Sequence, residues 1–140
     1  MTRKRAEGGG TEVRPESRST DPRFLGRWRI SEMELWDADF IDLEVPGHLT
    51  FADEQAGEFQ FGLVKAWMDC RYEKGRARIE FSWEGADDVD DACGRGWAEL
   101  DGDHLRGRIF IHRGDDSGFV ATKQAPNLAP NPRARRRVRP

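Results

Sequence analysis

The sequence predicts an all-β protein, a single small antiparallel meander barrel of seven or eight strands. Two observations lead to this fold class. Between residues 24 and 123, apolar and polar residues alternate in one short segment after another, with almost no helical period. Turn signals rich in Gly and Asp separate these segments. A meander this long is expected to close on itself, because closure removes the exposed strand edges.

The first expected strand carries Trp28 and Ile30 on one face. The apolar residues that follow are one position out of phase, which predicts a β-bulge near Ser31-Glu32. Residues 37–45 fit a single helical turn that ends before a Pro-Gly pair. Residues 49–51 mark a short second strand.

Long strands are expected in the middle of the chain. Apolar residues alternate over 59–63 and then, in the other phase, over 64–72, so a second bulge is predicted near residues 62–64. A hairpin loop over 73–75 leads to the clearest strand of the sequence, 77–83. One face of that strand is apolar and the other is polar, which is typical of an antiparallel sheet with one wet face.

Turns separate the last strands. Residues 85–91 are expected to form an acidic loop. The strand over 92–100 alternates small with large residues, and this pattern does not decide which of its two faces points inward. Asp101-Gly102 is typical of a type I′ hairpin, in which both central residues have positive φ. Strands over 105–111 and 119–123 complete the barrel.

Charge and composition divide the chain into three parts. Residues 1–23 and the Pro/Arg-rich residues 124–140 are expected to be disordered tails, and residues 24–123 the barrel domain. The domain carries twelve Lys/Arg against twenty-two Asp/Glu, a net charge of −10, whereas the last part has five Arg and no acid. We expect at most weak, non-specific contact between this basic tail and nucleic acid, opposed by the acidic domain.

The two cysteines and the hydropathy suggest a compartment. The chain opens without an apolar leader, and no run approaches the roughly 18 apolar residues of a membrane span. We therefore expect a cytoplasmic protein of bacterial type with reduced thiols and no membrane contact.

The segment Leu25-Gly26-Arg27-Trp28-Arg29-Ile30 resembles the Gly-x-Trp motif of the calycins, the lipocalin, fatty-acid-binding and avidin-like barrels. This resemblance implies that Trp28 closes one end of the barrel against an Arg from a late strand, for which Arg106 and Arg108 are candidates. The domain is also similar to a group of small uncharacterised bacterial proteins, which implies a self-contained domain and no particular function. The segments that carry this similarity are Gly26–Ile30, Glu32–Asp37, Phe81–Gly85, Gly94–Trp97 and Gly114–Phe119.

The first functional hypothesis is a non-enzymatic binder of a small, partly apolar ligand inside the barrel. A barrel of about eight strands has room for side chains or for one small ligand. Glycines on neighbouring strands would either leave that space or serve tight packing. One of two arginines would neutralise a polar head group. The candidate residues are Trp28, Phe61, Phe81, Trp83, Arg95 and Arg108 for the pocket, and Gly94, Gly96 and Gly107 for the space.

The second hypothesis is a protein-interaction module, with a homodimer as one form. It would use an acidic surface and exposed Trp residues, because Trp is enriched at interface hot spots. Trp67 and Trp97 would form one patch if both lie outside and adjacent. The candidate residues are Trp36, Trp67, Trp97, Asp37 and Asp39.

No catalytic residue, cofactor or metal ligand is predicted. The acidic runs over 32–44 and 87–91 lack the spacing of a calcium loop and are expected to be solvated surface. His104 and His112 would lie about 26 Å apart along one strand, too far to share a metal ion. Cys70 and Cys93 are expected to be buried, unreactive thiols, although either becomes a candidate nucleophile if a His lies beside it.

Overall fold

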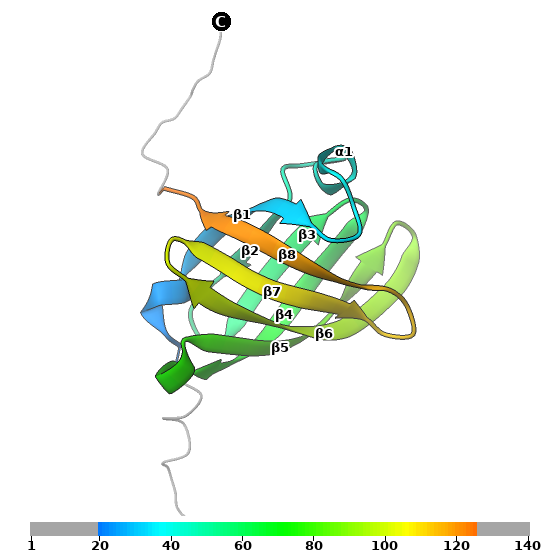
Figure 1. Cartoon of the computed structure of the whole chain (residues 1–140). Coiled ribbons are helices and arrows are strands. Elements are labelled where there is room, and N and C mark those ends of the chain that lie inside the picture. The colour runs from blue at the N-terminus through cyan, green and yellow to red at the C-terminus, as the bar shows by residue number, and fades with distance from the viewer. Residues whose placement is uncertain (1–19, 126–140) are drawn as a thin grey trace, which may run out of the picture.

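The computed structural model describes residues 20–125, with the side chain of Lys74 left out, as a closed antiparallel barrel of eight strands (Figure 1). Apart from residues 20–23 and 124–125, the two expected tails lie outside the described residues. The elements are, in chain order, η2 (Pro22–Phe24), β1 (Gly26–Met33), α1 (Ala38–Ile41), β2 (His48–Phe51), β3 (Ala56–Phe61), β4 (Val64–Glu73), η3 (Lys74–Arg76), β5 (Arg78–Asp87), β6 (Asp90–Asp101), β7 (His104–Ile111) and β8 (Asp116–Lys123).

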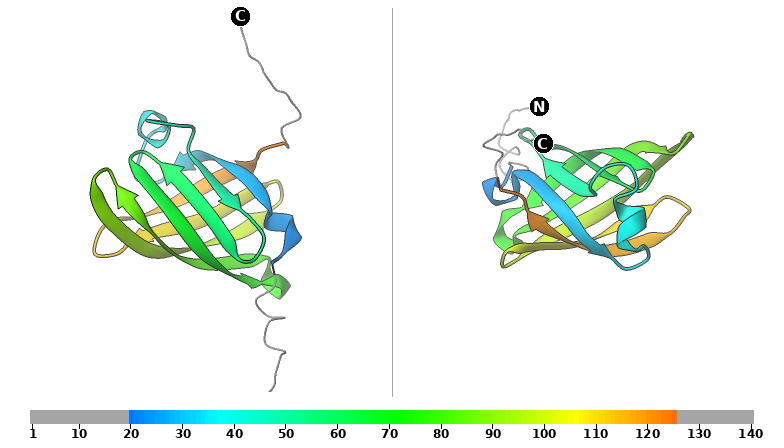
Figure 2. Two further views of the ribbon diagram at one scale, coloured as in Figure 1. Left: turned by 180° about the vertical axis from the view of Figure 1, so that it is seen from behind. Right: turned by 90° about the horizontal axis from the view of Figure 1, so that it is seen from above.

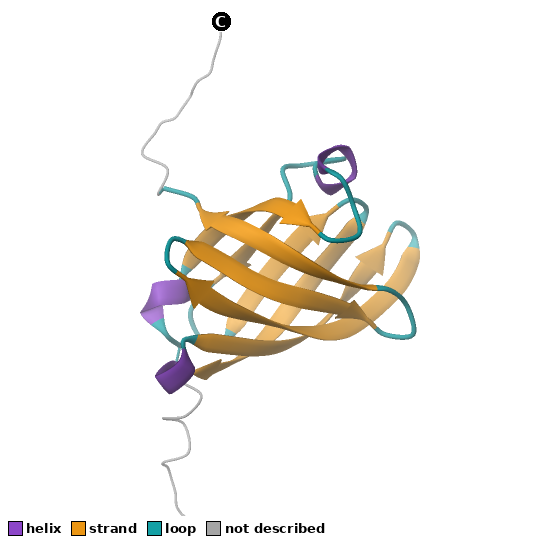
Figure 3. Ribbon diagram, in the orientation of Figure 1, coloured by secondary structure: helices purple, strands orange, loops and turns teal. Residues whose placement is uncertain are grey.

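Each strand pairs with the next one in the chain, and β8 returns to pair with β1. Figure 3 shows that strands make up most of the described chain. The all-β class and the closed meander barrel are therefore confirmed, with eight strands. Closure gives every strand two hydrogen-bonded neighbours, so that no strand edge is left open.

The phase changes in the sequence have two different origins. The pairing of β1 with β8 shifts between Ile30 and Glu32, which confirms the bulge expected there. The second expected bulge is wrong. Phe61 pairs with Val64, so the residues between them form the tight turn from β3 to β4, in which Gly62 has a φ of 56°.

Two turns differ from expectation. The acidic loop over 85–91 is wrong, because β5 continues to Asp87 and β6 begins at Asp90, which leaves a two-residue turn between them. In the hairpin from β6 to β7, Asp101 pairs with His104, so the central residues are Gly102 and Asp103. Only Gly102 has a positive φ among these two, at 60°, so the turn is not of type I′.

Aromatic rings fill the interior of the barrel. Phe59 is completely buried, and its ring centroid lies 5.9 Å from that of Phe61, 5.2 Å from that of Trp83 and 6.4 Å from that of Phe81. Trp28 is also buried, so all four aromatic residues that were expected inside are inside.

Rings also close the two ends. The short helices η2 and α1 lie at opposite ends of the barrel (Figures 1 and 2). At the η2 end, Phe24 is completely buried, and its ring lies 5.7 Å from that of Tyr72. At the α1 end, the half-buried Trp36 lies 5.7 Å from the ring of Phe40 and 5.2 Å from that of Phe61.

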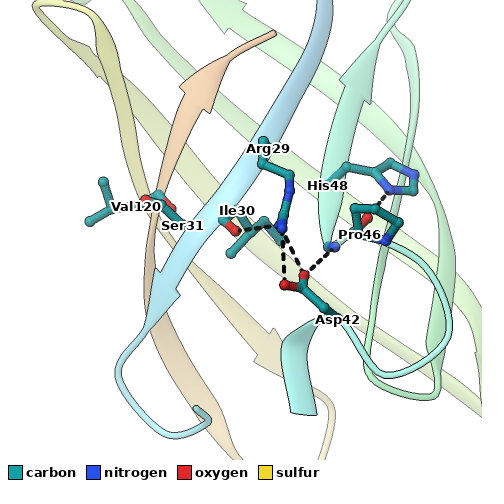
Figure 4. Close-up of polar contacts among 8 residues, drawn as sticks. Arg29, Ile30, Ser31, Asp42, Pro46, His48 and Val120 are labelled. Carbon is teal, nitrogen blue, oxygen red and sulfur yellow. Dashed lines mark hydrogen bonds and ion pairs between the residues drawn. The ribbon is translucent and has the colours of Figure 1, made fainter. Parts of the chain in front are cut away.

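A paired arginine and aspartate hold the α1 end in place (Figure 4). Arg29 on β1 donates two hydrogen bonds of 2.9 Å to the carboxylate of Asp42, which follows α1. The same carboxylate accepts a 2.8 Å hydrogen bond from the backbone N–H of Gly47. Bidentate pairing of this kind orients both partners, so it anchors the loop from β1 to β2 against the barrel wall.

Candidate functional site

Trp28 is covered by Lys123 of β8, and not by the late-strand arginine that the calycin resemblance implies. The indole N–H of Trp28 donates a 2.9 Å hydrogen bond to the carbonyl of Phe24. The ammonium nitrogen of Lys123 lies 4.8 Å from the centre of the Trp28 ring and donates to the carbonyl of Leu25 at 2.5 Å. A cation over an indole face is attracted by the ring quadrupole. The candidates Arg106 and Arg108 are therefore wrong for this position.

The arginines expected at a ligand head group lie outside the barrel. Arg108 pairs on the outer surface with Glu34 at 3.0 Å and with Asp116 at 2.5 Å. Arg95 is exposed, and its guanidinium carbon lies 4.3 Å from the centre of the Phe110 ring. Successive side chains of a strand point to opposite faces, and the buried neighbours Ile109 and Gly96 face inward. The predicted inward role of both arginines is wrong.

The glycines of β6 and β7 do not leave empty space inside. A Cβ atom placed on Gly96 would lie 2.5 Å from Cζ of Phe81, and one placed on Gly107 would lie 2.7 Å from Cζ of Phe119. Gly96 and Gly107 are both buried, which settles the inward face of β6 in favour of its small residues. The neighbouring rings occupy the places that these glycines leave.

A hollow lies on the outer face of strands β4 to β7. This outer groove has a volume of about 800 Å³. At its β4 side stands Trp67, which is 70% exposed. Strand pairing places Trp67 opposite Glu84 on β5, and Glu84 opposite Cys93 on β6. One line of outward side chains thus crosses three strands of the groove.

The β7 side of the groove combines an aromatic ring with cations. Phe110, His112 and Arg113 line it together with Arg95, which is opposite Phe110 in the strand pairing. The buried indole of Trp83 reaches the groove edge, where its N–H donates a 3.2 Å hydrogen bond to the carbonyl of Phe110. The groove therefore has apolar walls on two sides and positive charge at one end.

The two cysteines differ in environment. Cys70 is buried inside the barrel, and burial raises the pKa of its thiol to about 12. Cys93 is exposed in the outer groove, so the expectation that it is buried is wrong. The backbone N–H of His112, the residue that follows β7, donates a 2.8 Å hydrogen bond to the carbonyl of Cys93 on β6, so the two residues are neighbours. Their side chains form no hydrogen bond with each other in the described structure, so no nucleophile–base pair is assigned.

The other tryptophans proposed for an interaction surface are half-buried. Trp97 faces outward, but the guanidinium carbon of Arg78 lies 4.7 Å from the centre of its ring. It lines a separate hollow of about 300 Å³. Trp67 and Trp97 share one outer face, but the line of Ser82 and Arg95 lies between them, so they do not form one patch. Trp36 packs at the end of the barrel, as described above.

Asp37 and Asp39 belong to α1 in different ways. The carboxylate of Asp37 caps the helix by accepting a 3.0 Å hydrogen bond from the N–H of Phe40. Asp39 lies exposed in the first turn. Asp37 therefore has a structural task, and Asp39 is free to face solvent or a partner.

The chain matches no protein-family model, no curated protein and no solved structure. The calycin-like and bacterial resemblances therefore stay predictions. Within the described residues, no three His, Cys, Asp or Glu side chains are grouped closely enough to hold a metal ion. Over the same part of the chain, the helical segments lack the length and hydropathy needed to cross a membrane.

Several residues of the groove were not predicted from the sequence. For one of them, Phe110, the sequence does contain information on the direction of its side chain. Leu105, Gly107 and Ile109 alternate on the inward face, and this alternation places Phe110 outward. The sequence therefore predicts the outward position of Phe110, although a single outward aromatic residue does not by itself mark a site. For Glu84, His112 and Arg113 no such signal exists, because charged outward residues are ordinary.

Proposed function

We propose that this protein is a non-enzymatic binder of a small, partly apolar molecule, and that the ligand lies in the outer groove rather than in the barrel interior. The observation that carries the proposal is the exposed indole of Trp67 on a groove of about 800 Å³. Sites for small molecules measure roughly 300–1,000 Å³ and combine apolar walls with a few polar groups. The outer groove has that size and that mixture.

The interior offers less support for binding. The ring of Phe59 lies against those of Phe61, Phe81 and Trp83 inside the barrel. Phe24 packs against Tyr72 at one end of it. A ligand there would have to displace packed rings, whereas a ligand in the groove would cover an indole that is already exposed. Burial of that apolar surface would contribute roughly 25 cal/mol per Å².

The test uses the neutral aromatic probe 2-naphthamide and the full chain labelled with ¹⁵N. We expect the probe to shift the indole N–H signal of Trp67 and to slow alkylation of Cys93 by iodoacetamide, since both residues line the groove. W67A lacks the reporter indole, so its binding is followed by the protection of Cys93 from iodoacetamide; it should be weakened about tenfold, because about 1.4 kcal/mol of stacking and burial is lost. L43A is the matched control, because Leu43 is exposed but lies outside the groove. Unchanged binding by W67A would refute the site.

A second candidate function, contact with a protein partner or a second copy, is favoured by one observation. Three of the five large apolar residues that are exposed in the described chain lie in the segment 34–46 between β1 and β2: Leu35 at 49%, Leu43 at 54% and Val45 at 37%. The exposed Asp39 lies in the same segment. Sedimentation velocity of wild type and L43E tests this surface. A dimer that L43E dissociates supports it, and a monomer at all concentrations counts against the homodimer.

A further inference from the structure

Nearly all arginines of the barrel are paired with carboxylates. The described residues contain ten arginines, and eight of them form ion pairs. The side chains of the remaining two, Arg95 and Arg113, form no hydrogen bond or ion pair within the described chain, and both line the outer groove. In a domain with a net charge of −10, carboxylates are abundant, so two unpaired guanidinium groups in one groove are an exception.

A comparison with Arg78 shows what is unusual about Arg95. Both guanidinium groups lie on an aromatic ring of the adjacent strand, Arg78 at 4.7 Å from Trp97 and Arg95 at 4.3 Å from Phe110. Arg78 also donates to the carboxylates of Glu80 and Glu99. Arg95 is held on its ring in the same way, yet its side chain forms no ion pair with a carboxylate of the described chain. A stacked planar guanidinium with free donors is prepared for bidentate binding of a carboxylate-like group.

Arg113 reaches the groove from a backbone position that suits glycine better. It lies in the turn between β7 and β8, which is closed by a 2.8 Å hydrogen bond from the N–H of Gly114 to the carbonyl of Ile111. Its φ is 62°, in the left-handed region, whereas the glycine of this turn stands one residue later. A left-handed conformation costs a residue with a Cβ roughly 1–2 kcal/mol, and glycine avoids this cost.

The distribution of charge gives the groove a direction. Glu84 lies beside Trp67 at the β4 and β5 side, whereas Arg95 belongs to β6, and His112 and Arg113 belong to the turn after β7. An anionic group would be repelled at the first side and attracted at the second. An apolar body attached to that group would then extend toward Trp67. Two strand spacings separate β4 from β6, which is about 10 Å, the length of a two-ring molecule.

We propose that the outer groove selects small planar organic anions, with a carboxylate-like group bound by Arg95 and Arg113 and an aromatic body lying between Phe110 and Trp67. This inference rests on the proposed function, since it names the ligand class of the same groove. The negative charge of the rest of the domain would repel anions generally, so the two unpaired arginines would provide both attraction and selectivity.

The experiment compares 2-naphthoate with its neutral counterpart 2-naphthamide on the full chain, followed by the indole N–H signal of Trp67. We expect the carboxylate to bind about tenfold more tightly than the amide, and R95Q and R113G each to reduce that preference about threefold. R113G removes the charge while placing glycine at a left-handed position, so loss of the fold does not explain its effect. R106Q is the control, because Arg106 is an exposed arginine outside the groove.

The outcomes separate the two proposals. If both probes bind equally, or if R95Q and R113G keep the preference for the carboxylate, the anion inference is wrong and the groove remains a site for neutral apolar molecules. If neither probe shifts the signal of Trp67, the proposed function fails and the inference fails with it. A preference that R106Q reduces as much as R95Q would show a general charge effect and would also overturn the inference.

Discussion

The ring of Phe119 occupies the space that a side chain on Gly107 would need. The two residues are directly opposite each other on β8 and β7, and a Cβ on Gly107 would lie 2.7 Å from Cζ of Phe119. Close packing of this kind leaves no room for an added methyl group unless the ring or the strand moves. The pair thus shows that the glycines of these strands serve packing between an aromatic interior and the barrel wall.

G107A should therefore destabilise the barrel. Insertion of a methyl group into a packed core costs about 1–3 kcal/mol, so we expect the free energy of unfolding to fall by about 2 kcal/mol. Urea denaturation followed by tryptophan fluorescence measures the change. G75A is the control, because no atom lies within 4 Å of a Cβ placed there. Equal stability of G107A and wild type would show that the interior has free space.

The sequence was sufficient to predict the fold because alternation reports burial directly. The strand over 77–83 was identified from its polar and apolar faces, and the bulge near Ser31 from a one-residue change of phase. At residues 62–64 the same change of phase has another cause. The last inward residue of β3 is Phe61 and the first of β4 is Val64, three positions later, because a two-residue turn separates them. A tight turn and a bulge therefore give the same change of phase in the sequence. The hairpin over 85–91 is not predictable in this way. Neither face of its strands is buried there, so apolar and polar residues do not alternate along it.

The candidate site was less predictable than the fold. Outward positions of Trp67 and Arg95 follow from strand parity, but parity does not tell which outward residues meet. The groove depends on the pairing of β4 through β7, which brings Trp67, Cys93 and His112 together over separations of about twenty residues or more. Whether Arg95 and Arg113 stay unpaired depends on which partners the carboxylates of the whole domain find. No local sequence pattern encodes that.

Replacement of Asp42 tests the anchor of the α1 end. Hydrogen bonds from Arg29 and from the N–H of Gly47 lower the pKa of the Asp42 carboxyl. In D42N the charge is lost and the bidentate partner of Arg29 with it. Because the pair is partly exposed, we expect a loss of about 1 kcal/mol rather than the full value of a charge-assisted hydrogen bond. Thermal unfolding measures this loss, and D39N, which changes an exposed carboxylate of α1 itself, should leave the stability unchanged.

The cysteines should react very differently in the native protein. Iodoacetamide requires a thiolate, and the buried Cys70 has its pKa raised to about 12, so it should not react at pH 8. Cys93 is exposed and should be alkylated. Mass spectrometry should show one adduct on the native protein and two in guanidinium chloride, and C93S should show none until it is unfolded. Alkylation of native C93S would show that the barrel opens at Cys70.

The buried His48 should make stability depend on pH above neutrality. Its Nδ1 lies 2.8 Å from the carbonyl of Pro46 and its Nε2 lies 3.1 Å from a carboxylate oxygen of Glu58. Both neighbours are acceptors, so both ring nitrogens donate only in the protonated imidazolium. The hydrogen bond with the Glu58 carboxylate raises the pKa of His48. Burial lowers this pKa and the Pro46 carbonyl raises it, so the pKa in the folded protein is raised overall.

The sign of the effect follows from linkage. A raised pKa of His48 in the folded state means that the folded protein binds the proton more tightly, so this stabilisation is fully present below the unfolded pKa of about 6.5 and is lost as the pH rises through the higher folded value. Burial would raise the pKa of Glu58, but hydrogen bonds from His48 and Thr50 lower it, so the contribution of Glu58 is lost as the pH falls through its folded value. The pair is therefore most stabilising between the unfolded values of about 4.3 and 6.5.

We expect wild type to unfold at a lower temperature at pH 8.5 than at pH 6, and H48Q to show a smaller difference between the two. Each tenfold difference in proton affinity of His48 between the folded and unfolded states contributes about 1.4 kcal/mol. The pKa of His48 can be measured directly from its imidazole NMR signals. It should be higher in wild type than in E58Q, and the control H104Q should leave the pKa of His48 unchanged. A titration of His48 below that of a model imidazole would show that burial outweighs the Glu58 carboxylate, and the predicted loss of stability at high pH would then not occur.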